Sequence, residues 1–399
     1  MITGSRDDGA APGHTGGGFA ARLVGMSWAH LLNDGASNYL PGVLPAVLAT
    51  LGAPVRMAGV LVTALTIGQV LQPVTGRIAD RIGGRSLVLV GLLATSAGGG
   101  LLGVARSTPV VIVLLVLIGV GNAFFHPQAI SVVRGMLGAR EGLWISVFLI
   151  GGEIGRGLWP TVASLVVASL GLVNLWIVAI PGLLTVPFLL RFCPALPPKP
   201  RHDTTLRLHE HVRPGLLLIG YQGIRTVAIY AFVTFVPVLW HSRGGGLVGG
   251  ASIITTMTLV GVVGNLTGGH LSDRLGRRPV LIAAAVAAAA LIVPTAYLSG
   301  AWVWIVAAVL GIALFSTNST TVLLGQDIFA ENPSMGSGIA LGFANGVGAL
   351  LVFVIGLGVG ADVGFVFWVL GALSLASALL PLAFDTTLMK PPHPRASTA

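Results

Sequence analysis

A ten-residue segment occurs twice in this chain, once in each half, and its spacing constrains the fold more than any other feature. Residues 76–85 read GRIADRIGGR, and residues 269–278, 193 positions further along, read GHLSDRLGRR. Each copy follows one long apolar run and precedes another, so each predicts a turn between two membrane-spanning helices. A repeat at about half the chain length predicts two copies of one folding unit.

The composition places these units in a membrane. Only 9% of the 399 residues are charged, 54% are hydrophobic and the mean hydropathy is +0.91, whereas soluble domains carry about 25% charged residues. A transmembrane helix needs about 20 apolar residues, and the chain offers twelve such runs, six in each half. The predicted fold is an all-α integral membrane protein with 12 transmembrane helices in two pseudo-symmetric six-helix bundles. The expected spans are 22–49, 57–79, 87–105, 109–136, 143–169, 172–192, 214–240, 250–272, 279–299, 301–329, 334–360 and 363–384.

The spans divide the chain into five parts. We expect a disordered cytoplasmic tail (1–21), an N-terminal six-helix bundle (22–192), a cytoplasmic linker rich in proline and basic residues (193–213), a C-terminal six-helix bundle (214–384) and a cytoplasmic tail (385–399). Basic side chains gather in the loops on the side of the amino terminus, so the positive-inside rule predicts that both termini are cytoplasmic. This topology explains the net charge of +9, and we expect no nucleic-acid partner.

Four charged residues fall inside the expected spans, where a charge near the bilayer centre costs about 3 kcal/mol. They are Asp34, Glu153, Arg156 and Arg225. Each lies about ten to thirteen residues into an outward-running helix, which places all four roughly 15–20 Å from the cytoplasmic end, near the membrane centre. Charges at this depth mark ion or substrate pathways.

Asp34 shares one helix face with His30 and Asn38, which lie four residues before and after it. This polar face has two interpretations. It could hold helices together by hydrogen bonds, or the carboxyl group, in a partly dry cavity, could take up and release a proton. We favour proton transfer at Asp34, because an amide or hydroxyl group would hold helices at a lower cost.

Glu153 and Arg156 are three residues apart and can pair along their helix. The pair is either structural, or it opens when Glu153 accepts a proton and Arg156 accepts a ligand. Arg225 has no acidic neighbour in its own helix. Its planar guanidinium suits a carboxylate, phosphate or phosphonate, and the alternative is an interhelical bridge to Asp34 or Glu153.

Further polar residues lie in the fourth and tenth spans. His126 follows Asn122 and precedes Pro127, so it is either structural, in a bent helix whose freed carbonyl needs a partner, or a ligand contact. Residues 316–321, which include Asn318, are six small polar residues. Some must face a polar cavity, although hydroxyl groups also bond to their own backbone. The candidate substrate contacts are Arg156, Arg225, Asn38, Asn122, His126 and Asn318, and the candidate proton-coupling residues are Asp34, His30 and Glu153.

The doubled turn resembles the signature of the major facilitator superfamily between helices 2 and 3 and between helices 8 and 9. The resemblance implies that Asp80 and Asp273 close the cytoplasmic side against the starts of helices in the opposite half, near 334–336 and near 142 respectively. A helix amino terminus is partially positive and attracts a carboxylate. The gate residues implied by the motif are Gly76, Asp80, Arg81, Arg85, Asp273, Arg274 and Arg278.

Within that superfamily the chain resembles the fosmidomycin-resistance transporters, which are taken to export drugs in exchange for protons. The resembling segments are HLLND at 30–34, LPGVLP at 40–45, FHPQA at 125–129, IGGEIG at 150–155, GIRT at 223–226, VP at 236–237, LGQD at 324–327 and GIALG at 338–342. Two features depart from the pattern. The fourth helix lacks the Arg of multidrug proton antiporters, and Glu153 with Arg156 stands where this group is expected to have neutral residues. The substrate is therefore not transferred from the group.

We expect a secondary active transporter that exports a small anionic or amphipathic compound or drug by proton antiport and alternating access. The alternatives are proton-coupled uptake (symport) of an organic anion and a non-transporting receptor or scaffold on the same fold. No nucleophile–base pair or phosphate loop indicates an enzyme. The histidines of the linker do not have the spacing of a metal site. We expect no metal and no cofactor, with the transmembrane proton gradient as energy source. The expected partners are a small-molecule substrate, protons and the lipid bilayer, around a monomeric multi-pass protein of the cell (inner, cytoplasmic) membrane.

Overall fold

The computed structural model is built of helices, and each of the twelve expected spans coincides with helical segments. It describes residues 17–72, 74–75, 78, 84–136, 141–194, 208–331, 333–360 and 362–390, and no strand occurs within these ranges. Within the described ranges, eight helices are long and apolar enough to cross a membrane. The other spans are divided into shorter helices, as at the break between α1 and α2.

The described part of the first half contains seven assigned α-helices and three 3₁₀ segments. They are α1 (Gly17–Asn38), α2 (Leu40–Leu51), α3 (Met57–Ile67), η1 (Gly68–Leu71), α5 (Arg85–Leu101), η2 (Leu102–Val104), α6 (Thr108–Met136), α7 (Glu141–Leu170), η3 (Leu172–Ala179) and α8 (Ile180–Phe192).

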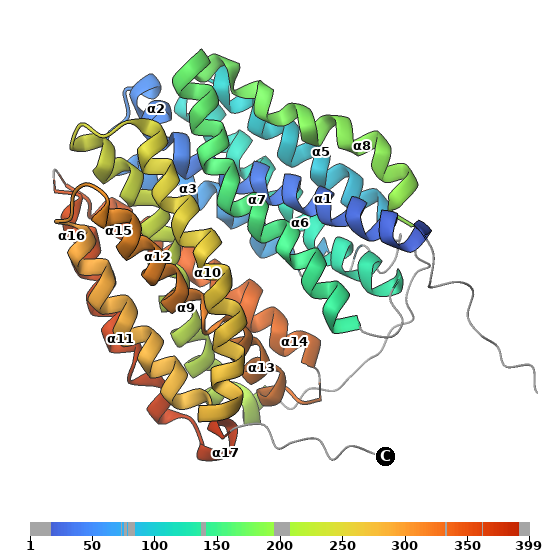
Figure 1. Cartoon of the computed structure of the whole chain (residues 1–399), viewed down its shortest axis with the longest axis vertical. Helices are drawn as coiled ribbons and strands as arrows, with labels where there is room; N and C mark the ends of the chain where they lie inside the picture. Colours follow the sequence, from blue (N-terminus) through green and yellow to red (C-terminus); the bar gives the residue numbers. More distant parts are fainter. Residues whose placement is uncertain are drawn as a thin grey trace, which may run out of the picture.

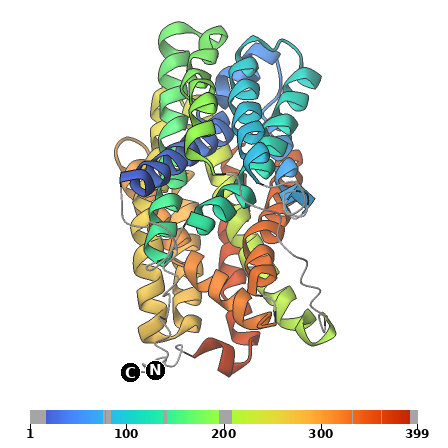
Figure 2. The ribbon, with the colours of Figure 1, turned by 90° about the vertical axis from the view of Figure 1, so that its right-hand side faces the viewer.

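The second half contains α9 (Leu208–Ser242), α10 (Leu247–Leu275), α11 (Arg277–Thr295), α12 (Trp302–Phe315), α13 (Asn318–Ile328), α14 (Pro333–Gly338), the π segment η4 (Ile339–Phe343), α15 (Ala344–Leu357), α16 (Gly364–Ser377), η5 (Leu380–Ala383) and α17 (Thr386–Met389). In Figure 2 most of the first half lies above most of the second half.

Two helices begin earlier than the sequence predicts. α1 starts at Gly17, so residues 17–21, which were expected in the disordered tail, are helical. The ring of Phe19 packs edge-on against Trp144 with centroids 5.4 Å apart, which holds this first turn on α7. α9 likewise starts at Leu208, inside the expected linker. At its start the His211 ring lies 5.1 Å from that of Phe329.

The two halves share one apolar core at one end of the molecule. This core joins α2 and α3 of the first half to α9, α10 and α15 of the second, and in Figure 1 these helices meet at the upper left. Leu44 and Leu61 pack there with Phe235 and Met257, all fully buried. We call this the closed end.

At the other end, where α1 begins and α17 lies, each half has its own core. The first half packs around residues such as Phe125 and Phe148, and the second around Leu218 and Leu281. No apolar cluster of the described residues joins the halves there, and in Figure 1 the two bundles diverge toward this side. We call it the open end.

Two hydrogen bonds between the halves follow the internal repeat. Thr63 on α3 donates to the carbonyl oxygen of Ala349 on α15 at 3.0 Å, and Thr255 on α10 donates to that of Gly157 on α7 at 2.6 Å. Adding the 193-residue offset to the position of Thr63 and subtracting it from that of Ala349 gives the second pair to within one residue on each helix. The pseudo-twofold of the sequence therefore survives in the contacts that close the molecule.

A close contact between glycines makes the closed end sensitive to a single methyl group. A Cβ at Gly59 would lie 2.9 Å from the Cα of Gly356 and 2.9 Å from the Val352 carbonyl oxygen. Gly59→Val should push α3 away from α15 and favour conformations in which the two halves are separated at the closed end. Electron-spin distance measurements between labels at the exposed Thr50 and Leu357 should then show a longer mean distance.

The matched control is Gly246→Val at the start of α10, where a Cβ would meet nothing within 4 Å. An unchanged distance distribution in the Gly59 variant would show that this contact does not hold the closed end together.

Candidate functional site

Three glycines let α7 lie directly on α1. A Cβ at Gly151 or Gly155 would collide with the carbonyl oxygens of Ser27 and Leu31, and one at Gly152 would collide with the ring of His30. Small residues four apart on one face are the usual means of bringing two membrane helices this close. The consequence is that the polar residues of α7 reach the buried face of α1.

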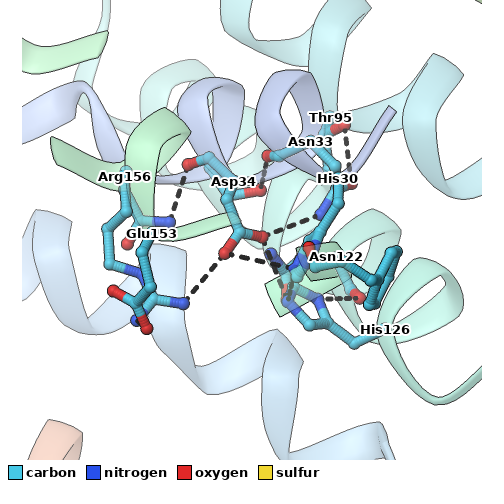
Figure 3. A network of polar contacts seen from close by, with 11 residues as sticks. His30, Asn33, Asp34, Thr95, Asn122, His126, Glu153 and Arg156 are labelled. Atoms are coloured by element: carbon cyan, nitrogen blue, oxygen red, sulfur yellow. Dashed lines mark hydrogen bonds and ion pairs between the residues drawn. The ribbon is translucent and has the colours of Figure 1, made fainter. Parts of the chain in front are cut away.

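Asp34 is the centre of a polar cluster drawn from α1, α6 and α7 (Figure 3). Its carboxylate is fully buried and lies 2.8 Å from the guanidinium of Arg156 and 3.0 Å from Nε2 of His126. Nε2 of His30 is 3.6 Å away, and the Asn33 amide donates to the carboxylate at 3.3 Å. One carboxylate therefore has three basic neighbours.

The two histidines are held by carbonyl oxygens. Nδ1 of His30 lies 2.9 Å from the carbonyl oxygen of Phe148, and its ring stacks on the Phe148 ring at 4.3 Å. Nδ1 of His126 lies 3.3 Å from the carbonyl oxygen of Asn122. The His30 side chain is 3% exposed and that of His126 is 20% exposed.

The carbonyl oxygen that Pro127 frees in α6 has a partner other than His126. Proline has no N–H, so it leaves the carbonyl oxygen four residues earlier, that of Ala123, without its helical partner. The Thr75 hydroxyl donates to this oxygen at 2.6 Å. A residue of the second span therefore satisfies the freed carbonyl. His126 lies instead beside Asp34, whereas the sequence analysis placed it among the candidate substrate contacts.

Arg156 links two carboxylates. Besides Asp34 it contacts Glu153, its neighbour at i−3, at 3.5 Å. The Arg156 side chain is 39% exposed and that of Glu153 is 18% exposed. Glu153 Oε2 and Asn122 Oδ1 are buried acceptors without a hydrogen-bond partner among the described residues. The cluster therefore presents one guanidinium and two unused acceptor oxygens.

Arg225 reaches the middle of the molecule from the other half. Its Nε donates to the carbonyl oxygen of Leu314, and its guanidinium lies 5.8 Å from the centroid of Phe315. No carboxylate of the described chain lies within ion-pair distance of it, although Glu153 and Arg156 are close enough to act on it electrostatically. The bridge from Arg225 to Asp34 or Glu153 does not form in this conformation, and the bond to Asp34 comes from Arg156 instead.

Tyr230, five residues after Arg225 on α9, belongs to the same region and was missed by sequence reasoning. Its phenol is near enough to Arg156, Asp34 and Arg225 to interact electrostatically with each. The only signal in the sequence is a tyrosine in mid-span, and one tyrosine in an apolar helix is a weak signal.

The other amide candidates have structural contacts. Asn38 ends α1 and donates to the carbonyl oxygen of Asp34 at 2.8 Å. Asn318 is the first residue of α13, after the break that ends α12. The neighbouring hydroxyls of Ser316 and Thr317 bond to carbonyls of their own helix. The polar run 316–321 thus satisfies much of its hydrogen bonding locally.

The motif residues that the structure describes contact their own half. Arg85 donates to the carbonyl oxygen of Leu190 at the end of α8. Arg278, its counterpart in the repeat, donates to the carbonyl oxygens of Pro381 and Phe384 at 3.1 and 2.9 Å, after α16. Asp273 and Arg274 are exposed, whereas Gly76, Asp80 and Arg81 lie outside the described residues.

The positive charge of Arg156 disfavours a metal ion at the cluster around Asp34. The ligand atoms of His30, Asp34 and His126 lie within 4.8 Å of one another, a spacing that metal sites also have. The guanidinium of Arg156 already binds the same carboxylate, so a divalent ion would add two positive charges beside it. A singly charged occupant of this space matches the surrounding charge better.

Removing Arg156 should leave Asp34 buried with less compensation. Arg156→Met should lower the free energy of unfolding by on the order of 1–3 kcal/mol, the usual cost of an unsatisfied buried polar group. In an Asp34→Asn background the same change should cost much less, because the charge is gone. Unfolding in detergent, with Arg56→Met at an exposed position as control, measures both values. Equal costs in the two backgrounds would show that the pair is not coupled.

Comparison with known proteins gives relatives and structural neighbours that are transporters and not enzymes. The chain is 26% identical over 352 residues to the fosmidomycin resistance protein of Escherichia coli K12, covering 84% of this chain and 85% of that protein. It is 25% identical over 373 residues to the gentisate transporter of Corynebacterium glutamicum, covering 85% and 80% respectively.

A solved structure shows the same fold. The nucleoside transporter NupG superposes with a TM-score of 0.80 at 16% sequence identity, over 92% of this chain and 99% of that one. The apolar helices and these relatives make the chain a multi-pass membrane protein. The family model of the Major Facilitator Superfamily matches residues 26–353, which is most of the chain, and the protein belongs to that superfamily.

Proposed function

We propose that this protein exports a small amphipathic compound in exchange for protons, by alternating access. The observation that carries the proposal is the buried carboxylate of Asp34, bound by basic side chains from α1, α6 and α7 and reached by the partly exposed Arg156. Buried ionisable groups at mid-membrane are the usual sites of proton coupling. His30 and Glu153 support Asp34 in this role.

The conformation fits one state of such a cycle. The halves pack together at the closed end and have separate cores at the open end. With both termini in the cytoplasm, as the positive-inside rule predicts, the open end faces the cytoplasm and would admit cargo from there. The exposed Asp273 and Arg274 would close this side in the opposite state.

Two acceptor atoms favour a cargo with hydrogen-bond donors. Asn122 Oδ1 and Glu153 Oε2 are buried and have no described partner, and an N–H or O–H group of a cargo would satisfy them. Such a cargo would compete with protons for the acceptors of this cluster, which is the requirement for exchange. Tyr230 and Phe315 offer aromatic surface to its apolar part.

A second candidate is uptake of an organic anion together with protons. It is favoured by Arg156, which binds Asp34 but is 39% exposed. An anion that took the guanidinium would leave Asp34 without this partner and raise its tendency to bind a proton. Gentisate, an aromatic carboxylate carried by one relative, is the natural probe. In inside-out vesicles with an acidic interior, an exported cargo should accumulate and a symported one should not.

Asp34→Asn tests the proton coupling. In proteoliposomes the variant should still exchange labelled for unlabelled cargo, but a pH gradient should no longer drive accumulation, because an amide does not ionise. The measurements are counterflow and pH-driven uptake of radiolabelled fosmidomycin and gentisate. The exposed Asp362 near the closed end supplies the control Asp362→Asn. Undiminished accumulation by the Asp34 variant would contradict the assignment.

Arg225→Gln tests the anion candidate. An anionic cargo that binds both halves should lose roughly 10–100-fold in affinity, the usual effect of one charge-assisted bond of about 1.5–3 kcal/mol. Ligand-induced thermal stabilisation by gentisate measures the change. Arg56→Gln, at an exposed position, should bind as the unaltered protein does. Equal stabilisation in both variants would exclude Arg225 from the binding site.

A further inference from the structure

Each imidazole ring beside Asp34 has one nitrogen whose hydrogen is fixed by its partner. Nδ1 of His30 faces the carbonyl oxygen of Phe148 at 2.9 Å, and Nδ1 of His126 faces that of Asn122 at 3.3 Å. A carbonyl oxygen only accepts hydrogen bonds, so both Nδ1 atoms carry a hydrogen. In a neutral ring the second nitrogen, Nε2, is then an acceptor.

These two acceptors point at each other and at one carboxylate (Figure 3). The Nε2 atoms of His30 and His126 are 3.3 Å apart, and the Asp34 oxygens lie 3.6 and 3.0 Å from them. With both rings neutral, three acceptors would face one another at contact distance with no hydrogen between them. One additional proton removes this conflict, because a protonated Nε2 donates to the carboxylate and lies against the second ring.

The charges around His126 also match one proton. α1 contributes Asp34 and the neutral His30, and α7 contributes Glu153 and Arg156. α3 has no titratable side chain, and α5 has only Arg85, at its start. Among the ionised groups of α1 and α7 in this cluster, two negative charges stand against one positive charge. A proton on the imidazole pair makes the cluster neutral.

The distances to Asp34 and the exposure of the side chains indicate that His126 holds this additional proton. Its Nε2 is closer to the carboxylate than that of His30, at 3.0 against 3.6 Å. Its side chain is 20% exposed, against 3% for His30 and 0% for Asp34. Asp34 accepts from Arg156 and Asn33, so protonating it would weaken both bonds.

We infer that His126 takes up and releases the coupled proton, and that Asp34 is a positioning residue that stays ionised. The inference rests on the proposed proton-coupled function, and it moves the coupled proton from Asp34 to His126. The proton comes from water on the open side and forms an N–H bond at Nε2 of His126. It returns to water when the opposite side opens, and no other covalent bond changes.

Infrared difference spectra between acidic and alkaline pH test this on the purified protein in liposomes. The titrating bands should shift when all histidines carry ¹⁵N and ¹³C, and the largest should be lost in His126→Gln. His241→Gln, at the exposed end of α9, is the matched control and should keep them. A protonated-carboxyl band that titrates and disappears in Asp34→Asn would overturn the inference. Because the chain has nine histidines, the isotope shift shows that a histidine titrates and the variant identifies which one. The expected absence of a titrating carboxyl band is read on the unaltered chain, so the inference can be overturned even if the His126 variant does not fold.

Transport in the same liposomes separates this inference from the function it rests on. His126→Gln should reduce pH-driven accumulation of fosmidomycin or gentisate to the level seen without a gradient. If the His126→Gln variant still accumulated cargo under a pH gradient, and the Asp34 carboxyl group titrated, the assignment of the coupled proton to His126 would be overturned. The proposed proton-coupled function would then stand. The other outcome is that His126 titrates but no compound moves with the pH gradient, neither the two named cargoes nor a wider set of amphipathic compounds and organic anions. The proposed function would then be wrong, and the assignment of the proton to His126 would still hold.

Discussion

A buried carboxylate needs positive partners, and the first half of this protein is arranged around that need. Asp34 is fully buried, and the groups that compensate it come from α1 itself, α6 and α7. A lone ionised carboxyl group at this depth would cost several kcal/mol. The contacts of His126 and Arg156 therefore tie the relative positions of three helices to the charge of one side chain. Any change in that charge alters the packing of the half.

The close packing that makes this possible is encoded by glycine. Gly151 and Gly155 let α7 lie against the backbone of α1, so the short reach from Arg156 to Asp34 is possible. Gly59 and Gly356 do the same for α3 and α15 across the two halves. The same device thus builds a rigid half and joins it to its partner at one end. The halves can separate elsewhere, because their cores at the open end are independent.

The repeat predicts the fold, and the charges inside the expected spans predict which region holds the polar cluster. Neither predicts which side chains pair with each other. Spacing alone gives the pair of Glu153 and Arg156, because both lie on one helix. That Arg156 prefers Asp34 depends on how two helices pack. The carbonyl that Pro127 frees is bound by Thr75 and not by His126, a contact between spans that no local pattern contains. The early start of α1 similarly depends on Phe19 meeting Trp144.

In the proposed function, the charges around Asp34 and Arg225 would set the sign of coupling between the proton and the cargo. When the histidines are neutral, the first-half cluster has two negative charges, Asp34 and Glu153, and one positive charge, Arg156. One added proton makes this cluster neutral, and Arg225 of the second half is then the remaining positive charge nearby. A cargo with hydrogen-bond donors or a positive charge must then compete with the proton, which produces exchange. An anionic cargo instead neutralises the added charge, so the two bind together and move together. Under the proposed function, the net charge of the cargo, and not a different set of residues, would therefore decide between export by antiport and uptake by symport.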